Sequence, residues 1–293
     1  PRWSPDSRKL VFTSDRTGWR NIGVIDVRTS QTRMLTGSKF DEYNPRWSPD
    51  GQWIAYVANC GWNFQLMKIR ANGSGNSIQI TNGDGVHGGI DAYQARGTIR
   101  WTPDNRRIVY TFMNHDRISD LWVISSAGGV ETQITDHMPE GLKEFSFVEP
   151  KLISYKSKDG LEIPAWLYRP QNAENSTTPL VIYARANTKG FHVKGFYPYI
   201  QYWVYKGYSV VAPQVRGSGG LGKRYEFLNY GDWGGGDIDD FAYAAFSLAE
   251  KGMVDPKNVF MQGGSTGGFF TFSMCHRYPD LLKAAVAFYG STD

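Results

Sequence analysis

Cysteine is nearly absent from this 293-residue chain, which contains only Cys60 and Cys275. These two residues lie in different halves of the sequence, so neither a disulfide framework nor a cysteine metal site is expected. No apolar run approaches the ~18 residues that a membrane-spanning helix needs. The formal net charge is only +4 and no segment is strongly basic, so we expect neither nucleic acid nor a membrane as a partner.

The first residues also lack two features. Pro1-Arg2-Trp3 includes neither an initiator methionine nor the apolar core of a signal peptide. We therefore expect the sequence to begin within a longer protein, and it predicts no cellular location. What is present is 41% hydrophobic and 15% aromatic residues, enough to build the cores of two globular domains.

Three stretches of the first half resemble one another. They are PRWSPDSRKLVF from Pro1, PRWSPDGQWIAY from Pro45 and IRWTPDNRRIVY from Ile99, and their tryptophans recur at intervals of 44 and 54 residues. The Ser/Thr-Pro-Asp core is typical of a turn, and the alternating apolar residues after it are typical of a strand. The sequence therefore predicts a repeat architecture.

Each repeat predicts about four short strands, which is the content of one propeller blade. The repeats resemble the TolB-type β-propeller repeat. We therefore expect residues 1–149 to form a partial β-propeller, an all-β fragment of about three blades. Because a propeller closes with ~4–8 blades, further blades are expected before Pro1. The alternative is an ordinary β-sandwich with chance matches to the motif.

Strands and helices alternate in residues 150–293. A predicted hairpin, with strands 152–157 and 161–168, is followed by buried strands such as PLVIYA and by amphipathic helices such as DIDDFAYAAFSLAEKG. Apolar runs suit strands that are buried on both faces. This half therefore predicts an α/β domain with a mostly parallel sheet layered by helices.

The stretch MQGGSTGGFF, residues 261–270, predicts a strand, a sharp turn at Ser265 and a helix. In a nucleophile elbow the residues two before and two after the central one must be small, and Gly263 and Gly267 meet this requirement. We therefore predict that Ser265 is a nucleophile. The alternatives are a solvated serine in a glycine-rich turn and a phosphate loop, which the missing GxxxxGK[ST] pattern disfavours.

Several motifs of the second half resemble one family. SKDGLEIPAWLYRP, GYSVVAPQVRGSGGLGKRY, GGGDIDDFAYA, VDPKNV and GGSTGG occur in the order found in the prolyl oligopeptidase family of serine peptidases. That family couples an N-terminal propeller to an α/β-hydrolase domain. The resemblance implies that residues 150–293 are the N-terminal part of the α/β-hydrolase domain, and that the chain is truncated at both ends.

The partners of Ser265 are expected outside the chain. In α/β hydrolases the acid and then the histidine follow the serine along the sequence. Only His276, Asp280 and Asp293 are available after Ser265, and His276 lies about three turns along the predicted helix, away from the hydroxyl. By resemblance, both partners belong to a later segment, and this 293-residue chain is expected to be inactive.

The family resemblance also implies an oxyanion hole. One donor is the backbone N–H of the residue after the serine, here Thr266. The second comes from the loop that usually reads His-Gly-Gly-Pro or Tyr-Gly-Gly-Phe, but this chain reads YARANTKGF. Arg185 stands at the position of the His or Tyr, so Arg185, Asn187 or a nearby backbone N–H is the candidate for the second donor.

Other polar residues are interpreted as structural. Arg216 could contact substrate or Asp237, but bracing of its own loop is favoured. The acidic residues of 232–240 are expected to cap and start a helix rather than to bind metal. The histidines show no ligand spacing, so no metal or cofactor is expected. They are His87, His115, His137 and His192.

Three functions fit these observations. The first is a serine-type oligopeptidase, acylaminoacyl peptidase or dipeptidyl peptidase that hydrolyses short peptides through an acyl-enzyme on Ser265. The second is an esterase on the same fold. The third is a non-catalytic propeller binding protein with a degenerate hydrolase domain, for which the altered ARAN sequence is the supporting feature.

Overall fold

The structure is a computed structural model that describes residues 1–89, 99–173, 176–185 and 189–291. Contacts within the chain divide it into two compact units, and each is described by itself. Unit 1 comprises Pro1–Phe145, Val193–Phe196 and Gly220–Lys223. Unit 2 comprises Ser146–His192, Tyr197–Gly219 and Arg224–Asp293.

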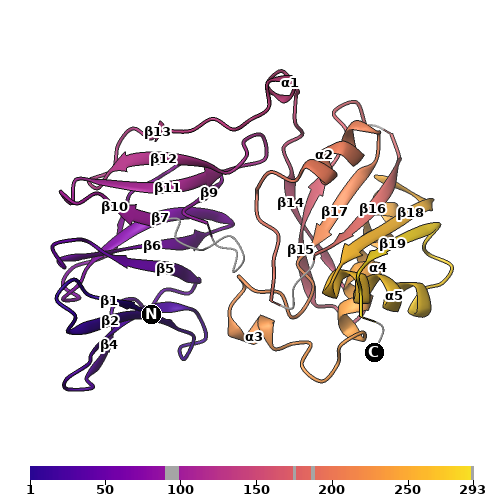
Figure 1. Cartoon of the computed structure of the whole chain (residues 1–293). Helices are drawn as coiled ribbons and strands as arrows, with labels where there is room; N and C mark the ends of the chain where they lie inside the picture. The colour runs from indigo at the N-terminus through magenta and orange to yellow at the C-terminus, as the bar shows by residue number, and fades with distance from the viewer. Residues whose placement is uncertain (90–98, 174–175, 186–188, 292–293) are drawn as a thin grey trace. The chain divides into compact units, whose positions relative to one another are not determined.

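The first repeat of unit 1 forms a four-stranded antiparallel sheet, drawn in indigo and violet in Figure 1. Its strands lie in chain order: β1 (Arg2–Trp3), β2 (Lys9–Ser14), β3 (Asn21–Asp26) and β4 (Thr32–Met34). Val11 and Ile22 are fully buried and pack against the core residues of the second repeat, such as Ile54. Four strands per repeat is the number that the sequence predicts.

The turn shared by the repeats is held by a hydroxyl group. In the first repeat Ser4 Oγ donates to Asp6 Oδ1 at 2.6 Å and accepts a hydrogen bond from Lys9 N at 2.9 Å. Ser48 and Thr102 make the equivalent two bonds in the second and third repeats. Because a hydroxyl donates and accepts at once, one side chain closes both ends of the turn.

The second and third repeats share one sheet of nine strands. The short strand β9 joins them, because it pairs parallel with β7 at Phe64 and antiparallel with β11 at Phe112. The repeat pattern alone did not indicate this joining strand. The nine strands are β5 (Glu42–Trp47), β6 (Trp53–Cys60), β7 (Asn63–Arg70), β8 (Ile78–Gln79), β9 (Val86–His87), β10 (Ile99–Trp101), β11 (Arg107–Met113), β12 (Asp120–Ser125) and β13 (Thr132–Gln133).

Unit 2 is built on a six-stranded sheet with the order β14-β15-β17-β16-β18-β19. The pairs β14–β15 and β15–β17 are antiparallel, and the pairs β17–β16, β16–β18 and β18–β19 are parallel. The strands are β14 (Lys151–Lys156), β15 (Glu162–Tyr168), β16 (Thr178–Ala184), β17 (Ser209–Pro213), β18 (Val254–Gly264) and β19 (Ala284–Phe288).

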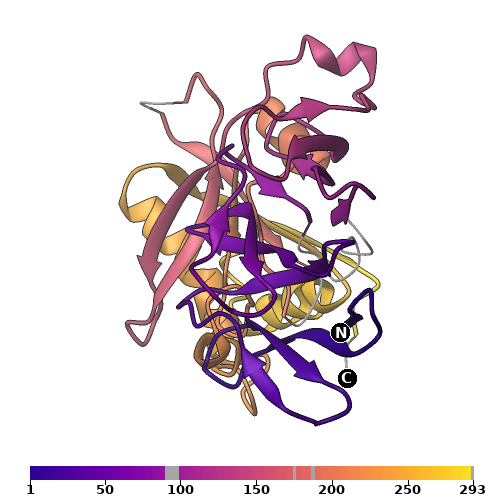
Figure 2. The same ribbon diagram turned by 90° about the vertical axis from the view of Figure 1, so that its left-hand side faces the viewer.

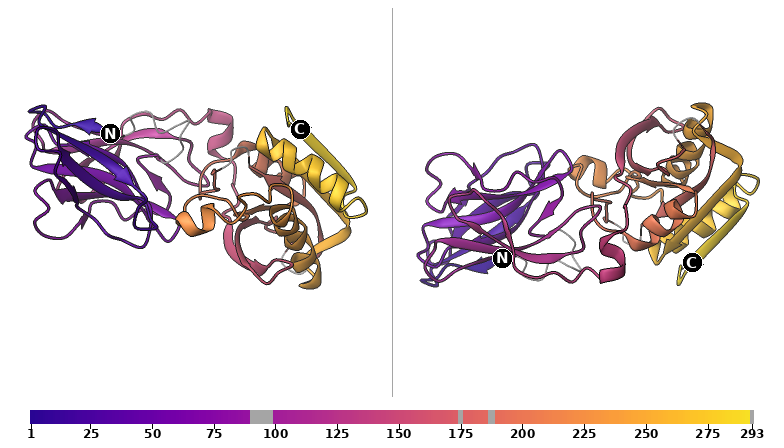
Figure 3. Two further views of the ribbon diagram at one scale, coloured as in Figure 1. Left: turned by 90° about the horizontal axis from the view of Figure 1, so that it is seen from below. Right: turned by 90° about the horizontal axis from the view of Figure 1, so that it is seen from above.

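Five helices complete the described elements. They are α1 (Glu140–Lys143), α2 (Pro198–Tyr205), α3 (Lys223–Glu226), α4 (Gly236–Glu250) and α5 (Thr266–Arg277). The sequence predicts α2, α4 and α5 but not the single turns α1 and α3. Helix α5 lies along β19, as both views of Figure 3 show. None of these helices reaches the length and apolarity needed to cross a bilayer.

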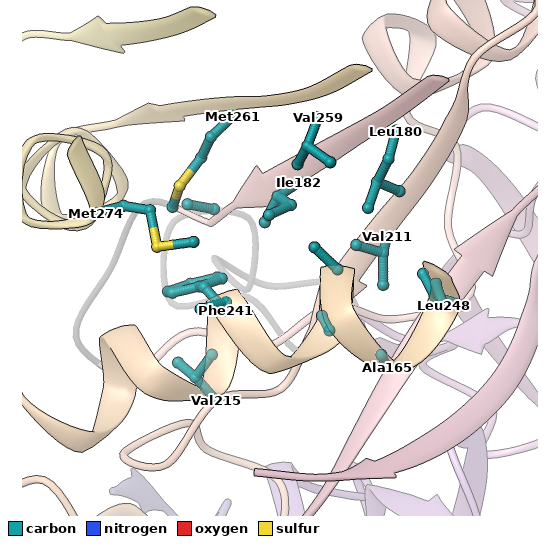
Figure 4. Close-up of a cluster of buried hydrophobic side chains, with 14 of the residues drawn as sticks. Ala165, Leu180, Ile182, Val211, Val215, Phe241, Leu248, Val259, Met261 and Met274 are labelled. Atoms are coloured by element: carbon teal, nitrogen blue, oxygen red, sulfur yellow. The ribbon is translucent and has the colours of Figure 1, made fainter. Parts of the chain in front are cut away.

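The core of unit 2 lies between the sheet and helices α4 and α5. Ile182 and Met261 project from neighbouring parallel strands toward Phe241 of α4 and Met274 of α5 (Figure 4). All four side chains are buried. This packing fixes α5 against the end of β18, and therefore fixes the turn between them. In unit 1 the hairpins of the three repeats run from indigo through violet to magenta in Figure 2.

Candidate active site

Ser265 occupies a sharp bend between a buried strand and a helix. Strand β18 ends at Gly264, helix α5 begins at Thr266, and Ser265 between them has φ 54° and ψ −120°. A serine rarely adopts positive φ, and such strain costs on the order of 1–3 kcal/mol unless the surroundings enforce it. The residue is exposed, so its hydroxyl is accessible from solvent.

Close backbone approaches enforce the bend. A Cβ on Gly263 would lie 2.3 Å from the carbonyl oxygen of Gly267, and a Cβ on Gly267 would lie 2.3 Å from that of Ala184. Any side chain at these two positions would collide with main chain that cannot rotate away. The requirement for small residues on both sides of Ser265 is therefore met by glycine for a steric reason.

Backbone hydrogen bonds tie the bend to its neighbours. The Ser265 N–H donates to Phe288 O of β19 at 2.9 Å, and Phe269 N donates to Ser265 O at 3.1 Å. Thr271 Oγ1 donates to Gly267 O at 2.8 Å inside the helix. The bend is thus anchored to the next parallel strand and to the first turn of α5.

Two of the three predicted oxyanion donors, Thr266 and Arg185, fall at the same edge of the sheet. Thr266 is the first residue of α5, where backbone N–H groups point outward from the positive end of the helix. Arg185 directly follows β16, whose last residue Ala184 pairs with Gly263. Its side chain donates from Nη1 to Tyr197 Oη at 3.4 Å. Asn187 lies outside the described residues.

Neither His276 nor Asp280 is brought to Ser265, as the sequence predicts. His276 lies in the last turn of α5 and is exposed, eleven residues and about 16 Å of helix rise from the serine. Asp280 is exposed beyond the helix, and Asp293 lies outside the described residues. Within the described part of the chain, no residue is hydrogen-bonded to Ser265 Oγ.

Arg216 braces a loop, as predicted, but its partner is not Asp237. Its Nη2 donates to Asp240 Oδ1 at 2.8 Å, and its Nη1 donates to Asp159 Oδ2 at 2.9 Å. The fully buried Asp240 also accepts hydrogen bonds from the Arg216 backbone N–H and from Ser157 Oγ. The side-chain hydrogen bonds from Arg216 to Asp240 and to Asp159 raise the pKa of the guanidinium.

The four acidic residues near α4 divide into two roles. Asp232 and Asp237 accept hydrogen bonds from the backbone N–H groups of Gly236 and Gly234, as expected for residues at a helix start. Asp239 and Asp240 were also expected there, but they form ion pairs with Arg277 and Arg216 instead. Burial raises the pKa of Asp237 to about 6.

Among the histidines of unit 2, His192 packs beside strand β16. His192 is 1% exposed, and its ring packs at 5.3 Å from Tyr183 and 5.6 Å from Tyr197. Burial and the charge of Arg185 hold the pKa of His192 well below its usual range, so the ring is neutral. Among the described residues, no group of three or more potential metal ligands comes together.

One residue near the elbow was missed at the sequence level. Tyr289 follows β19 with φ 40°, and its hydroxyl lies 3.1 Å from the place that a Cβ on Gly264 would take. It is 84% exposed, so a ligand at this edge would meet its ring. The position of Tyr289 could have indicated this, because the residue follows a predicted parallel strand next to the strand that leads to Ser265.

Comparison with family models supports this description. The model of the prolyl oligopeptidase family matches residues 195–293, and that of the TolB beta propeller domain matches residues 1–89. Residues 195–293 of the hydrolase-like half are thus similar to the prolyl oligopeptidase family. The predicted resemblance is therefore confirmed, as is the predicted fold class of propeller blades followed by an α/β-hydrolase region.

Individual relatives of the chain are named as peptidases. "Uncharacterized peptidase YuxL" of Bacillus subtilis is 32% identical over 172 residues, covering 58% of this chain and 26% of that protein. "Dipeptidyl-peptidase 5" of Porphyromonas gingivalis is 24% identical over 349 residues, covering 98% of this chain and 49% of that protein. The chain thus spans at most about half the length of these two relatives.

Solved structures share the fold. A puromycin hydrolase superimposes with a TM-score of 0.83 at 21% identity, covering 99% of this chain and 44% of its own. The acylaminoacyl peptidase of Pyrococcus horikoshii gives a TM-score of 0.76 at 20% identity, covering 97% of this chain and 44% of its own. At these identities the likeness establishes the fold of the family alone.

Proposed function

We propose that this chain is part of a serine-type peptidase that hydrolyses short peptides through an acyl-enzyme on Ser265. The observation that carries the proposal is the conformation of Ser265, exposed at positive φ between β18 and α5. Strained turns of this kind are characteristic of nucleophiles in α/β hydrolases. The position also falls within residues 195–293, the part that matches the peptidase family.

The proposed mechanism begins with attack of Ser265 Oγ on the carbonyl carbon of the scissile peptide bond. A general base accepts the hydroxyl proton, and the carbonyl π electrons move onto the oxygen. The Thr266 N–H and a second donor near Arg185 stabilise this oxyanion. When the tetrahedral intermediate collapses, the base returns the proton to the leaving amine. Water then cleaves the acyl-enzyme by the same steps.

The acid and the base are proposed to come from residues outside this chain. The described residues bring no His–Asp pair to Ser265, and without a base a serine hydroxyl keeps its high pKa and reacts poorly. The 293-residue chain alone is therefore expected to be inactive. Relatives named as dipeptidyl peptidases suggest a short-peptide substrate class.

Active-site labelling tests this proposal. A longer polypeptide that contains this chain and the following coding sequence is treated with a fluorophosphonate probe. We expect labelling that disappears in Ser265→Ala and persists in Ser273→Ala, a matched variant on the outer part of α5. Labelling that is unchanged by Ser265→Ala would refute the nucleophile. Absence of any label, with the longer polypeptide folded, would favour a non-catalytic binding protein.

A substrate panel then separates the enzyme classes. Dipeptidyl, acylaminoacyl and internally cleaved peptide amides are compared with short acyl esters of the same acyl groups. We expect turnover of at least one peptide amide by the longer polypeptide. Turnover of esters alone, lost in Ser265→Ala, would identify an esterase and contradict the peptidase assignment.

A further inference from the structure

Three arginines occupy the same position in the three repeats of unit 1. Arg2, Arg46 and Arg100 each directly precede the tryptophan of the repeated turn motif. They lie in β1, β5 and β10, and each pairs with the residue nine positions later in the following strand. Equal register places their side chains at the same level of each repeat. We name this group the arginine column.

The tryptophans hold the three strands next to one another. Trp47 Nε1 donates to the carbonyl of Arg2 at 3.1 Å, and Trp101 Nε1 donates to the carbonyl of Arg46 at 3.3 Å. Strand β5 therefore lies between β1 and β10, with Arg46 at the centre of the column. Residues 44 and 54 positions apart in sequence become immediate neighbours through one recurring hydrogen bond.

The guanidinium groups of Arg46 and Arg100 share a conformation. Arg46 Nη1 donates to Pro45 O at 2.9 Å, and Arg100 Nη1 donates to Ile99 O at 3.0 Å, so both side chains fold back onto the preceding carbonyl. Within the described residues, no carboxylate forms an ion pair with any member of the column. Burial and the charges of Arg2 and Arg100 lower the pKa of Arg46 to about 10.

A column of like charges is unfavourable in the free protein and favourable for an anion. Each guanidinium keeps N–H donors for a planar carboxylate, with which it forms strong charge-assisted hydrogen bonds. The carbonyl groups of Arg2 and Arg46 already accept hydrogen bonds from indole N–H groups. A ligand would therefore bind to the charged side chains of the column rather than to these backbone carbonyls.

We propose that the arginine column is a binding site for a short acidic peptide, with successive carboxylates of the peptide contacting Arg2, Arg46 and Arg100. A linear array on neighbouring strands matches an extended chain that carries several carboxylates better than it matches one compact ion. The site does not depend on the proposed peptidase function, because binding involves no residue of the elbow at Ser265. Its test therefore measures binding and not turnover.

Fluorescence anisotropy tests the proposal with the complete 293-residue chain. The probe is fluorescein-labelled hexaglutamate, and unlabelled hexaglutamine serves as the neutral competitor. We expect hexaglutamate to bind and hexaglutamine not to displace it. Arg46→Gln should weaken binding about tenfold, since it removes one charge-assisted contact from the centre. Arg107→Gln, which removes an exposed strand arginine outside the column, should leave the Kd within about twofold.

Two further measurements keep the proposal open to refutation. Arg46→Lys retains the positive charge but loses the planar guanidinium with its paired N–H donors. Its Kd for hexaglutamate should therefore fall between those of wild type and Arg46→Gln. In the free protein, Arg46→Gln should raise the unfolding temperature, whereas a residue with a purely structural role would lower it. Equal loss of binding in Arg46→Gln and Arg107→Gln would show attraction to net charge only. Binding of inorganic polyphosphate without hexaglutamate would likewise overturn the peptide assignment.

Discussion

Replacing Gly267 with alanine should open the elbow around Ser265. The added Cβ would lie 2.3 Å from Ala184 O, 3.0 Å from Ala184 C and 3.1 Å from Arg185 C. These are backbone atoms at the end of β16, which pairs with β18 at Gly263, so no side-chain rotation relieves the contact. The first turn of α5 must instead move away from the sheet.

The expected cost follows from two opposing terms. Overpacking of a dense site typically costs about 1–3 kcal/mol. Because the added Cβ overlaps rigid backbone, we expect the upper end of this range, about 3 kcal/mol. Alanine in place of glycine returns at most about 1 kcal/mol of helix propensity. The closed elbow is therefore destabilised by about 2 kcal/mol. This corresponds to a roughly 30-fold increase in the population of the open state, in which the first turn of α5 has moved away from the sheet.

Hydrogen–deuterium exchange with peptide resolution measures this change. Amides of β18 and α5 should exchange roughly 30-fold faster in Gly267→Ala, while β2 and β3 of unit 1 keep their rates. Gly141→Ala is the matched control, because Gly141 is also helical and a Cβ there meets nothing within 4 Å. Exchange in β18 and α5 that stays within twofold of wild type would show that the close approach does not constrain the elbow.

Two other predictions concern the charges of unit 2. The pKa of Asp237 is about 6 in the folded chain against 3.8 ordinarily, so folding favours the protonated carboxyl. The contribution of Asp237 to the free energy of unfolding is therefore full below about pH 4 and is lost as pH rises through about 6. Asp237→Asn should therefore stabilise the chain by up to about 3 kcal/mol at pH 8 and by nothing at pH 3.5, and equal effects at both values in urea unfolding would contradict the assignment. Arg216→Gln leaves the fully buried Asp240 without its ion-pair partner, and should cost about 3–5 kcal/mol in the same assay. The double variant Arg216→Gln/Asp240→Asn should recover most of that loss, and failure to do so would place the cost elsewhere.

The elbow was predictable from sequence because its determinants are local. Strand, glycine, serine, glycine and helix follow one another within MQGGSTGGFF, and the structure places β18, Ser265 and α5 in that order. The turn motif of unit 1 was predictable for the same reason, since Ser4 bonds residues only two and five positions away. The residues that make these hydrogen bonds and steric contacts are close together in the sequence, so the sequence pattern alone predicts the turn.

Features that depend on tertiary neighbours were not predictable from the same patterns. Arg216 has two candidate acidic partners on one helix, and only the packing of α4 selects Asp240 over Asp237. Charge spread evenly along the sequence suggested no basic cluster, yet β5 brings Arg46 between two arginines that are 44 and 54 residues away. The order of charges along the sequence does not predict a cluster of arginines that forms only when separate strands lie side by side.

Ser265 and Arg46 have a common physical property: each is held in a state that costs free energy. For Ser265 the cost is positive φ, and the support is the close approach of Gly267 to β16. Strain of this kind persists only where the surroundings outweigh it. Removing the strained group should therefore stabilise the fold, whereas removing its support should destabilise it.

Ser265→Gly tests this inference directly. Glycine accepts φ 54° without steric cost, so on the order of 1–3 kcal/mol of strain is relieved. The more flexible unfolded chain takes back about 0.4–1 kcal/mol. Thermal unfolding of unit 2 should thus shift upward by the equivalent of about 1 kcal/mol, opposite in sign to Gly267→Ala. A downward shift of similar size in Ser265→Gly would mean that the serine side chain stabilises the turn, and the bend would then need no functional explanation.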